Sequence, residues 1–369
     1  MSKMQYEPDP MGSYQPDDCV FLLRDLSMQS LEMSNEERER LIQSGTHYSE
    51  MLPIEYQPSE EYLTLFHKTL TVYAKRIAIA VGVVAEQINM QKSLKNLVLV
   101  SLARAGTPIG VLIKRYLKEH YSVDIPHYSI SIIRGKGFDE TAISYIFGKH
   151  PDANIQFIDG WTGKGAITKQ LEQSCVKYNE NYGTQIDSDL AVLADPGHCS
   201  SLYGTREDFL IPSACLNSTV SGLVSRTIFN EILLTKGDFH GAKFYKELRD
   251  DDVSNLYVDK ISNYFQDIAK EMRGVLVKRL LEDTTPTWLG IKAVEAIQKE
   301  MEIPDANLVK PGIGETTRVL LRRVPWKILI NPACIDELEH VLLLAKDKNI
   351  PIEEYPNMSY SCCGLIKKV

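Results

Sequence analysis

Residues 157–165 constrain the fold of this chain more than any other segment. A hydrophobic run from Ile155 ends in the carboxylate of Asp159, and a loop over 160–165 with three glycines follows at once. The next residues, 166–178, have the pattern of a helix, so the segment predicts a strand, a tight turn and a helix N-terminus. Backbone N–H groups and the helix dipole favour an anion there. The segment therefore predicts a phosphate-binding loop in which Asp159 orients a sugar hydroxyl or a metal ion.

Three further predicted strands end in loops rich in glycine or charge. The strands and loops are 97–102 before 104–107, 128–133 before 134–137, and 190–194 before 195–198. Short apolar strands separated by helices predict an α/β fold with a parallel sheet covered on both faces. Because ligands bind at the carboxyl ends of the strands in such sheets, we expect these loops to form one site.

The length of 369 residues allows two or three domains. We expect a loosely packed N-terminal extension over 1–58, an α/β domain over 59–285 whose part after 222 is mostly helical, and a smaller α/β domain over 286–369. No apolar stretch is long enough to cross a bilayer, and the polar, proline-rich start is unlike a secretory signal. These features predict a cytoplasmic protein with no membrane partner, and they leave the oligomeric state open.

Cysteine usage and charge exclude several classes of protein. The seven cysteines are scattered and include no C-x-x-C pair, which favours a reducing compartment over a disulfide scaffold or a zinc site. The net charge of −8 gives the whole molecule no general attraction to nucleic acid.

Two of the strand-end loops carry arginine. Arg104 and Gly106 precede a predicted helix, where glycine permits close backbone contact and arginine grips oxygen atoms bidentately. Arg134 and Lys136 lie among glycines in a segment that predicts a flap over an anionic substrate. A helix cap or an exposed turn is the alternative for each loop alone. The glycine spacing of 160–165 excludes a triphosphatase loop, which needs four residues between its first two glycines.

Together these loops resemble the type I phosphoribosyltransferases, in which an acidic strand end precedes a Thr-Gly-rich loop that binds the 5′-phosphate of phosphoribosyl pyrophosphate. The resemblance implies Mg²⁺ bound through the substrate, with no metal ligands from the protein. It implies catalytic roles for Arg104, Arg134, Lys136 and Asp159. It implies phosphoribosyl pyrophosphate binding by Ala105, Gly106, Thr107, Asp159, Gly160, Thr162, Gly163, Lys164 and Gly165. The family usually has paired acidic residues, whereas Gly160 follows the acid here.

The run from Gly204 to Gly222 is dense in small hydroxyl and amide side chains. We expect it to recognise a nucleobase-like acceptor, together with the loop at 195–198, where His198 suits acid–base chemistry near neutral pH. The predicted acceptor-binding residues are Asp195, His198, Arg206, Ser213, Asn217 and Ser218. A network of caps and turns is the alternative.

A cysteine protease is a minor alternative. It requires a cysteine, a histidine and an orienting group close in space. Cys215 lies in the polar run, His198 and His240 are possible partners, and Cys199 directly follows His198. No local pattern resembles a papain-type nucleophile, and a buried structural cysteine is the simpler interpretation of Cys215.

The C-terminal segment has a concentration of positive charge between Leu308 and Lys327. The run 310–318 resembles the RNA-contacting turn of archaeal L7-type and Pelota domains, with glycine at 314 where that pattern has asparagine. The resemblance implies contacts to structured RNA by Lys310, Gly314, Glu315, Arg318 and Arg322. A solvated basic helix is the alternative.

The segments 159–165, 210–223 and 238–242 together resemble one bacterial family over nearly the whole chain. Its members are phosphoribosyltransferase-like proteins with a C-terminal Pelota-type domain, found with tellurium-resistance stress genes, and some are labelled cysteine protease StiP. The resemblance implies a phosphoribosyltransferase with an unknown acceptor. A non-catalytic nucleotide sensor that gates RNA binding is the second interpretation, because one carboxylate stands where two are usual.

Overall fold

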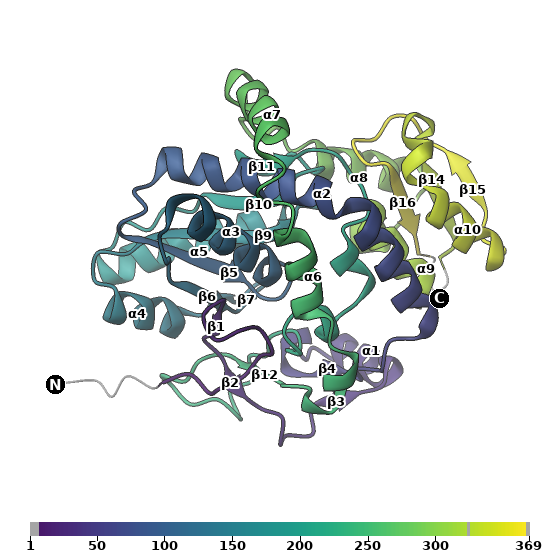
Figure 1. The fold of residues 1–369 in the computed structure, drawn as a ribbon. Helices are drawn as coiled ribbons and strands as arrows, with labels where there is room; N and C mark the ends of the chain where they lie inside the picture. The colour runs from purple at the N-terminus through teal and green to yellow at the C-terminus, as the bar shows by residue number, and fades with distance from the viewer. Residues whose placement is uncertain (1–6, 323–324, 367–369) are drawn as a thin grey trace.

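A parallel β-sheet forms the centre of the molecule, and the computed structural model describes residues 7–322 and 325–366 (Figure 1). Its strands lie in the order β1-β6-β5-β9-β10-β11, and each neighbouring pair is parallel. Their bounds are Val20–Phe21 (β1), Leu97–Leu102 (β5), His127–Ile130 (β6), Asn154–Trp161 (β9), Leu190–Ala194 (β10) and Leu202–Thr205 (β11). The predicted α/β class with a central parallel sheet is confirmed.

Helices cover both faces of this sheet. They are α2 (Glu60–Gln91), α3 (Gly106–Tyr121), α4 (Glu140–Lys149), α5 (Ala166–Tyr182), α6 (Ser254–Ser262) and α7 (Ala269–Leu281). Leu99 and Ile158 pack with α2 and α3 in one core, whereas Val100 and Phe157 pack with α4 and α5 in another. The strands are therefore apolar on both faces, as the sequence predicts. No helix within the described ranges is long and apolar enough to cross a membrane.

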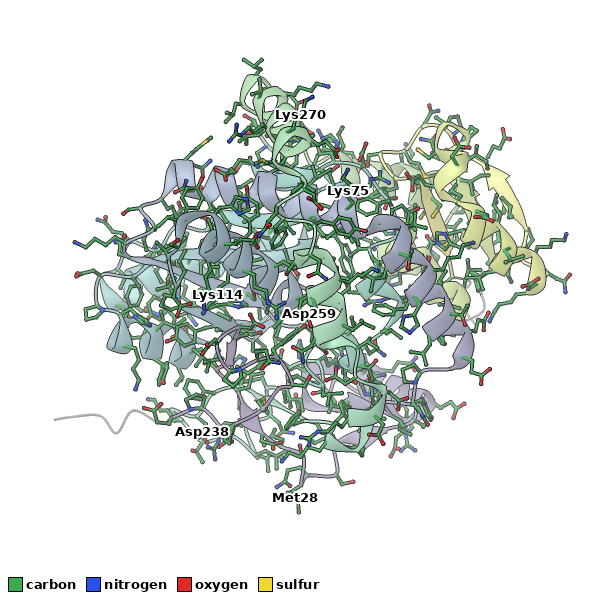
Figure 2. The ribbon with its side chains drawn as sticks, in the orientation of Figure 1. Met28, Lys75, Lys114, Asp238, Asp259 and Lys270 are labelled. Atoms are coloured by element: carbon green, nitrogen blue, oxygen red, sulfur yellow. The ribbon has the colours of Figure 1, made fainter. Side chains whose placement is uncertain are left out.

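The N-terminal segment is built into this core, so the expectation of a loosely packed extension is wrong. Strand β1 lies beside β6, and Leu22 and Leu23 are fully buried. Arg115 on α3 pairs with Asp18 at 2.5 Å and with Asp259 on α6, labelled in Figure 2, at 2.6 Å. The polar, proline-rich composition around the short apolar run concealed this packing. The remaining elements are α1 (Asn35–Gln43), β2 (Arg24–Asp25), β3 (Glu32–Met33) and β4 (Leu52–Pro53).

Residues 222–253 contain no α-helix, contrary to expectation. Apart from β12 (Gly241–Ala242) and a 3-10 helix over Lys246–Asp251, they form turns and loops, and α-helix resumes only at α6. Gly222 and Gly237 have positive φ values of 79° and 103°, which helices do not accommodate. Farther along, α7 projects from the body of the molecule (Figure 1).

The C-terminal domain has its own four-stranded sheet in the order β13-β16-β14-β15. Its elements are α8 (Leu289–Glu300), β13 (Val309–Pro311), α9 (Ile313–Arg322), β14 (Lys327–Ile330), α10 (Glu339–Asp347), β15 (Ile352–Glu354) and β16 (Cys362–Leu365). A 3-10 turn over Ala306–Leu308 precedes β13, because Asp305 accepts the backbone N–H of Asn307 at 2.8 Å. The expected small α/β domain is present.

The start of α8 is bonded to the turn that follows β10. The Trp288 N–H donates to His198 O at 2.9 Å, and the Gly290 N–H donates to Gly197 O at 2.9 Å. An added Cβ on Gly290 would lie 2.7 Å from Gly197 Cα, so only glycine permits this approach. We call this contact the domain joint.

A half-buried carboxylate connects the two parts at a second place. Asp208 accepts the N–H of Ile313, at the start of α9, at 3.0 Å and the N–H of Ser361 at 2.8 Å. Burial raises the pKa of the Asp208 carboxyl to about 6. Arg76 on α2 adds an ion pair with Glu337 at 2.6 Å.

Gly106 sets how closely α3 approaches β9. A Cβ at this position would lie 2.3 Å from the carbonyl oxygen of Ile158, which is far below van der Waals contact. We expect Gly106→Ala to lower the free energy of unfolding by about 2 kcal/mol, because overpacking outweighs the gain in helix propensity. Urea denaturation measures this change in the free energy of unfolding. Gly274→Ala on α7 is the matched control, since its Cβ meets nothing within 4 Å. Equal stability of the two variants would contradict the prediction.

Candidate functional site

A cavity of about 200 Å³ lies at the carboxyl end of β9, between the N-terminal region and the C-terminal domain. The N-terminal region contributes Arg134, Asp159, Trp161 and the loop 162–165, and the C-terminal domain contributes Asn307, Lys310 and Glu315. The predicted phosphate loop, flap arginine and RNA-contacting lysine therefore line one cavity, which we call the joint pocket. Sequence reasoning had assigned these residues to two separate sites.

The loop 162–165 is fixed by contacts behind the pocket. The hydroxyl of Thr162 donates to Asp195 at 2.5 Å, and the hydroxyl of Tyr360 donates to Gly163 O at 3.0 Å. Gly165 has φ of 77° and begins α5, whose N-terminal residues line the pocket. The first N–H groups of a helix have no intrahelical acceptor, so this wall presents hydrogen-bond donors.

Positive charge dominates the pocket. Arg134, Lys164 and Lys310 line it together, and the Lys164 ammonium donates to Ala306 O. Burial, together with the charges of Lys310 and Arg134, lowers the pKa of Lys164 to about 8. The surroundings of Lys164 therefore favour deprotonation of its ammonium group unless an anion is nearby.

The pocket carboxylates compensate only part of this charge. Burial raises the pKa of Asp159 to about 7, although the Gly160 N–H donates to its carboxylate at 2.7 Å. Near neutral pH this carboxyl is therefore only partly ionised. Glu315 lies 3.5 Å from Arg318.

The predicted pyrophosphate loop is not brought into the joint pocket. Arg104 reaches Val224 O and the Asn217 amide oxygen, both at 3.4 Å, and Thr107 pairs with Ser129 at 2.7 Å. Ala105 lies against Gly160. A Cβ added to Gly160 would lie 2.9 Å from the carbonyl oxygen of Ala105. These residues hold α3 against the sheet.

The two cations of the predicted flap, Arg134 and Lys136, differ in position: Arg134 lines the joint pocket and Lys136 does not. Residues 132–138 form a short hairpin of β7 (Ile132–Ile133) and β8 (Gly137–Phe138). The Lys136 ammonium lies 5.4 Å from the Phe229 ring centre, outside the pocket lining. Arg134 also lines a second cavity of about 350 Å³ with Arg226, a residue that sequence reasoning missed.

The predicted acceptor-binding residues lie outside the joint pocket and mostly contact neighbouring loops. Asp195 is fully buried and accepts the N–H groups of Cys199 at 2.7 Å and of Ser200 at 3.3 Å. Arg206 approaches Asp195 to 3.6 Å. Ser218 and Asn217 both donate hydrogen bonds to the Glu55 carboxylate. Ser213 is buried. The alternative of caps and turns describes most of this run.

The predicted RNA-contacting turn packs against the N-terminal region. Arg318 lies 5.5 Å from the Trp161 ring centre and donates to Ala214 O at 3.0 Å. A Cβ on Gly314 would approach Ala214 to 3.3 Å. Lys310 and Glu315 line the joint pocket. The Arg322 side chain lies outside the described part of the chain.

Of the cysteines, Cys199 lies directly behind the joint pocket. Its sulfur is 3.6 Å from Gly163 O and 3.2 Å from Gly197 O. Burial, then the charge of Asp195, raises the pKa of the Cys199 thiol to about 12. The preceding His198 is half-buried, and burial followed by the Arg206 charge lowers its pKa. Its imidazole is therefore neutral at pH 7.

Cys215 is a buried structural cysteine, as the simpler interpretation of the sequence predicted, and it is not placed as a nucleophile would be. It is fully buried in the core formed with α2 and α3. His240 lies elsewhere, with Nδ1 2.9 Å from Ser131 Oγ. Among the described residues, no group of three or more His, Cys, Asp or Glu side chains is placed to hold a metal ion.

The parallel sheet, its strand-end pocket and the appended small domain define a two-domain α/β protein whose pocket is shared by both parts. Residues 12–262 match the family described as tellurite-like stress resistance cysteine protease StiP, and the chain belongs to that family. Residues 288–368 match the Pelota RNA-binding domain. The chain is 32% identical over 369 residues to a protein of Acinetobacter baylyi named cysteine protease StiP, covering 97% of this chain and 94% of the relative.

These comparisons overturn the phosphoribosyltransferase interpretation. The family and the relative are both named as cysteine proteases, which is a hydrolase class and not a glycosyltransferase class. The resemblance to the stress-resistance family and to the Pelota domain is confirmed. Phosphoribosyl pyrophosphate and Mg²⁺ as ligands remain predictions that nothing in the structure tests.

Proposed function

We propose that this chain is a hydrolase of the cysteine-protease class and that Cys199 is its nucleophile. The observation that carries the proposal is the turn after β10, in which Cys199, the adjacent His198 and the buried Asp195 lie within five residues behind the joint pocket. The Asp195 carboxylate accepts the backbone N–H of Cys199 at 2.7 Å, and the backbone N–H of His198 donates to the main-chain carbonyl oxygen of Asp195 at 3.0 Å, so these bonds fix the shape of the turn. A nucleophile, a base and an orienting group are the parts that this chemistry needs.

The chemistry follows that of thiol nucleophiles. The imidazole of His198 accepts the thiol proton, the thiolate sulfur attacks the peptide carbonyl carbon, and the proton passes to the departing amine. Water then hydrolyses the thioester and restores the thiol. A neutral His198 supports the base role, since its pKa is lowered by burial and by Arg206.

The docked C-terminal domain covers this turn. Trp288 and Gly290 bond to it, and Cys199 is 1% exposed. A thiol with a pKa of about 12 is protonated at neutral pH and is a weak nucleophile. The proposal therefore includes opening of the domain joint before hydrolysis. Its test is hydrolysis of denatured casein by the full chain and by Cys199→Ala.

We propose RNA binding as a second activity, favoured by the match of residues 288–368 to an RNA-binding domain. Lys310 and Lys164 face one cavity, which supports electrostatic attraction of phosphates in a molecule that is acidic overall. The finer expectation of base recognition at Gly314 is not included, because that residue lies against Ala214.

Replacing Lys310 tests RNA binding. We expect Lys310→Ala to weaken binding of a hairpin RNA several-fold and to reduce the slope of log K against log salt by about 1, because one phosphate contact is lost. Fluorescence anisotropy across a salt series measures both quantities. Lys346→Ala, on the exposed face of α10 in the same domain, is the matched control. An effect equal to that of the control would count against the proposal.

A further inference from the structure

The joint pocket has features that neither proposed activity explains by itself. Its lining combines the N-terminus of α5 with cations from two domains. Peptide hydrolysis by Cys199 requires none of these cations. An RNA site confined to the C-terminal domain would not require Arg134 or Lys164, which belong to the N-terminal region.

We infer that the joint pocket binds the terminal phosphate of an RNA strand through Lys164, Arg134 and Lys310. The inference rests on the RNA-binding proposal and extends it to residues of the N-terminal region. The ligand carries a phosphate monoester at a strand end, and the remainder of the strand lies along the C-terminal domain.

The charge balance of the pocket favours a dianion. Three cations line it, while Glu315 pairs with Arg318 at 3.5 Å and Asp159 is partly protonated near neutral pH. A phosphate monoester carries a charge of about −1.5 to −2 at pH 7, whereas an internal phosphodiester carries only −1. A terminal phosphate therefore offsets the excess charge better than the strand interior.

The size of the pocket fits one such group. At about 200 Å³ it is smaller than the roughly 300–1,000 Å³ of sites that enclose drug-sized ligands. The helix wall supplies N–H donors through Gly165 and Ala166, at an end where the helix dipole attracts negative charge. We therefore place the phosphate in the pocket and the base and ribose outside it.

The position of Lys164 indicates that the occupant joins the domains. This side chain starts from the N-terminal region, and its ammonium donates to Ala306 O of the C-terminal domain. Lys310 lines the pocket from the C-terminal domain. A phosphate between the two would bond to both parts of the molecule.

The test compares RNA ends. Fluorescence anisotropy is measured for the full chain with a 12-nucleotide RNA that carries a 5′-phosphate, a 3′-phosphate or hydroxyls at both ends. We expect one phosphorylated form to bind about ten-fold more tightly than the hydroxyl form, since charge-assisted bonds to phosphate are strong. Lys164→Met should remove this preference. Lys177→Met on α5, where Lys177 pairs with Glu140 on the surface, should keep it.

The outcomes separate this inference from the proposal beneath it. If none of the three RNAs binds the wild-type chain, RNA binding itself fails. If all three bind equally, or if Lys164→Met and Lys177→Met behave alike, RNA binding stands and the terminal-phosphate site is overturned. Arg134→Met provides a second variant at an exposed position, so a folding defect in Lys164→Met cannot decide the result.

Discussion

Replacing Cys199 by alanine should abolish hydrolysis of denatured casein, with a loss of at least about 1000-fold. The thiol is the group that forms the covalent intermediate, and removing a nucleophile leaves only binding and polarisation by other groups. The substitution removes one buried sulfur with little change in packing, because the side chain lies between Gly163 O and Gly197 O. Initial rates of peptide release measure the effect.

The matched control is Cys175→Ala. Cys175 is also buried, at 2% exposure, but it lies on α5 in the core beneath the sheet. Its loss should leave the rate within about two-fold, because a packing change there touches no group of the pocket. Equal rates for the two variants would remove Cys199 from the mechanism. A loss confined to Cys215→Ala would move the nucleophile to the buried polar run.

Gly290→Ala should open the domain joint. The added Cβ would lie 2.1 Å from the Tyr360 hydroxyl and 2.8 Å from Gly163 O, so the start of α8 must move away from the turn after β10. We expect alkylation of Cys199 by iodoacetamide to accelerate at least ten-fold at pH 7. Both the exposure of the thiol and the fall of its pKa from about 12 contribute, since the thiolate is the reacting form.

Mass spectrometry of each alkylated cysteine measures this rate. Cys334, which is partly exposed and lies away from the joint, serves as an internal reference in the same sample. Gly274→Ala controls for the substitution itself. If Cys199 reacts no faster in Gly290→Ala than in the wild type, the joint does not control access to the thiol.

The sequence predicted the sheet because its strands are buried on both faces. Runs such as 97–102 and 155–158 are apolar throughout, which identifies parallel strands without knowledge of their neighbours. It also predicted that the loop after Asp159 would line a pocket. Ligands bind at the carboxyl ends of parallel strands, and a strand followed by a glycine loop can be recognised from neighbouring residues alone. Strand β1 was missed because two residues carry no periodic signal.

The predicted enzyme class was wrong, and the loop after β5 shows the physical reason. Arg104 and Gly106 have the residue types of a pyrophosphate loop, yet Gly106 serves close packing on Ile158 and Arg104 contacts Val224. Glycine before a helix has the same local appearance in both roles. The placement of Cys199 behind the pocket depends on the path of a turn held by Asp195, and only the adjacent His198 hinted at it.

The sequence by itself determined the two α/β parts and the glycine loop at the end of β9, because apolar periodicity and turn chemistry act over a few residues. Tertiary structure alone decided that Lys310 meets Lys164 and Arg134 in one pocket and that α8 covers Cys199. Those contacts join residues from distant parts of the chain. They depend on how two separately patterned surfaces dock, which no local pattern encodes.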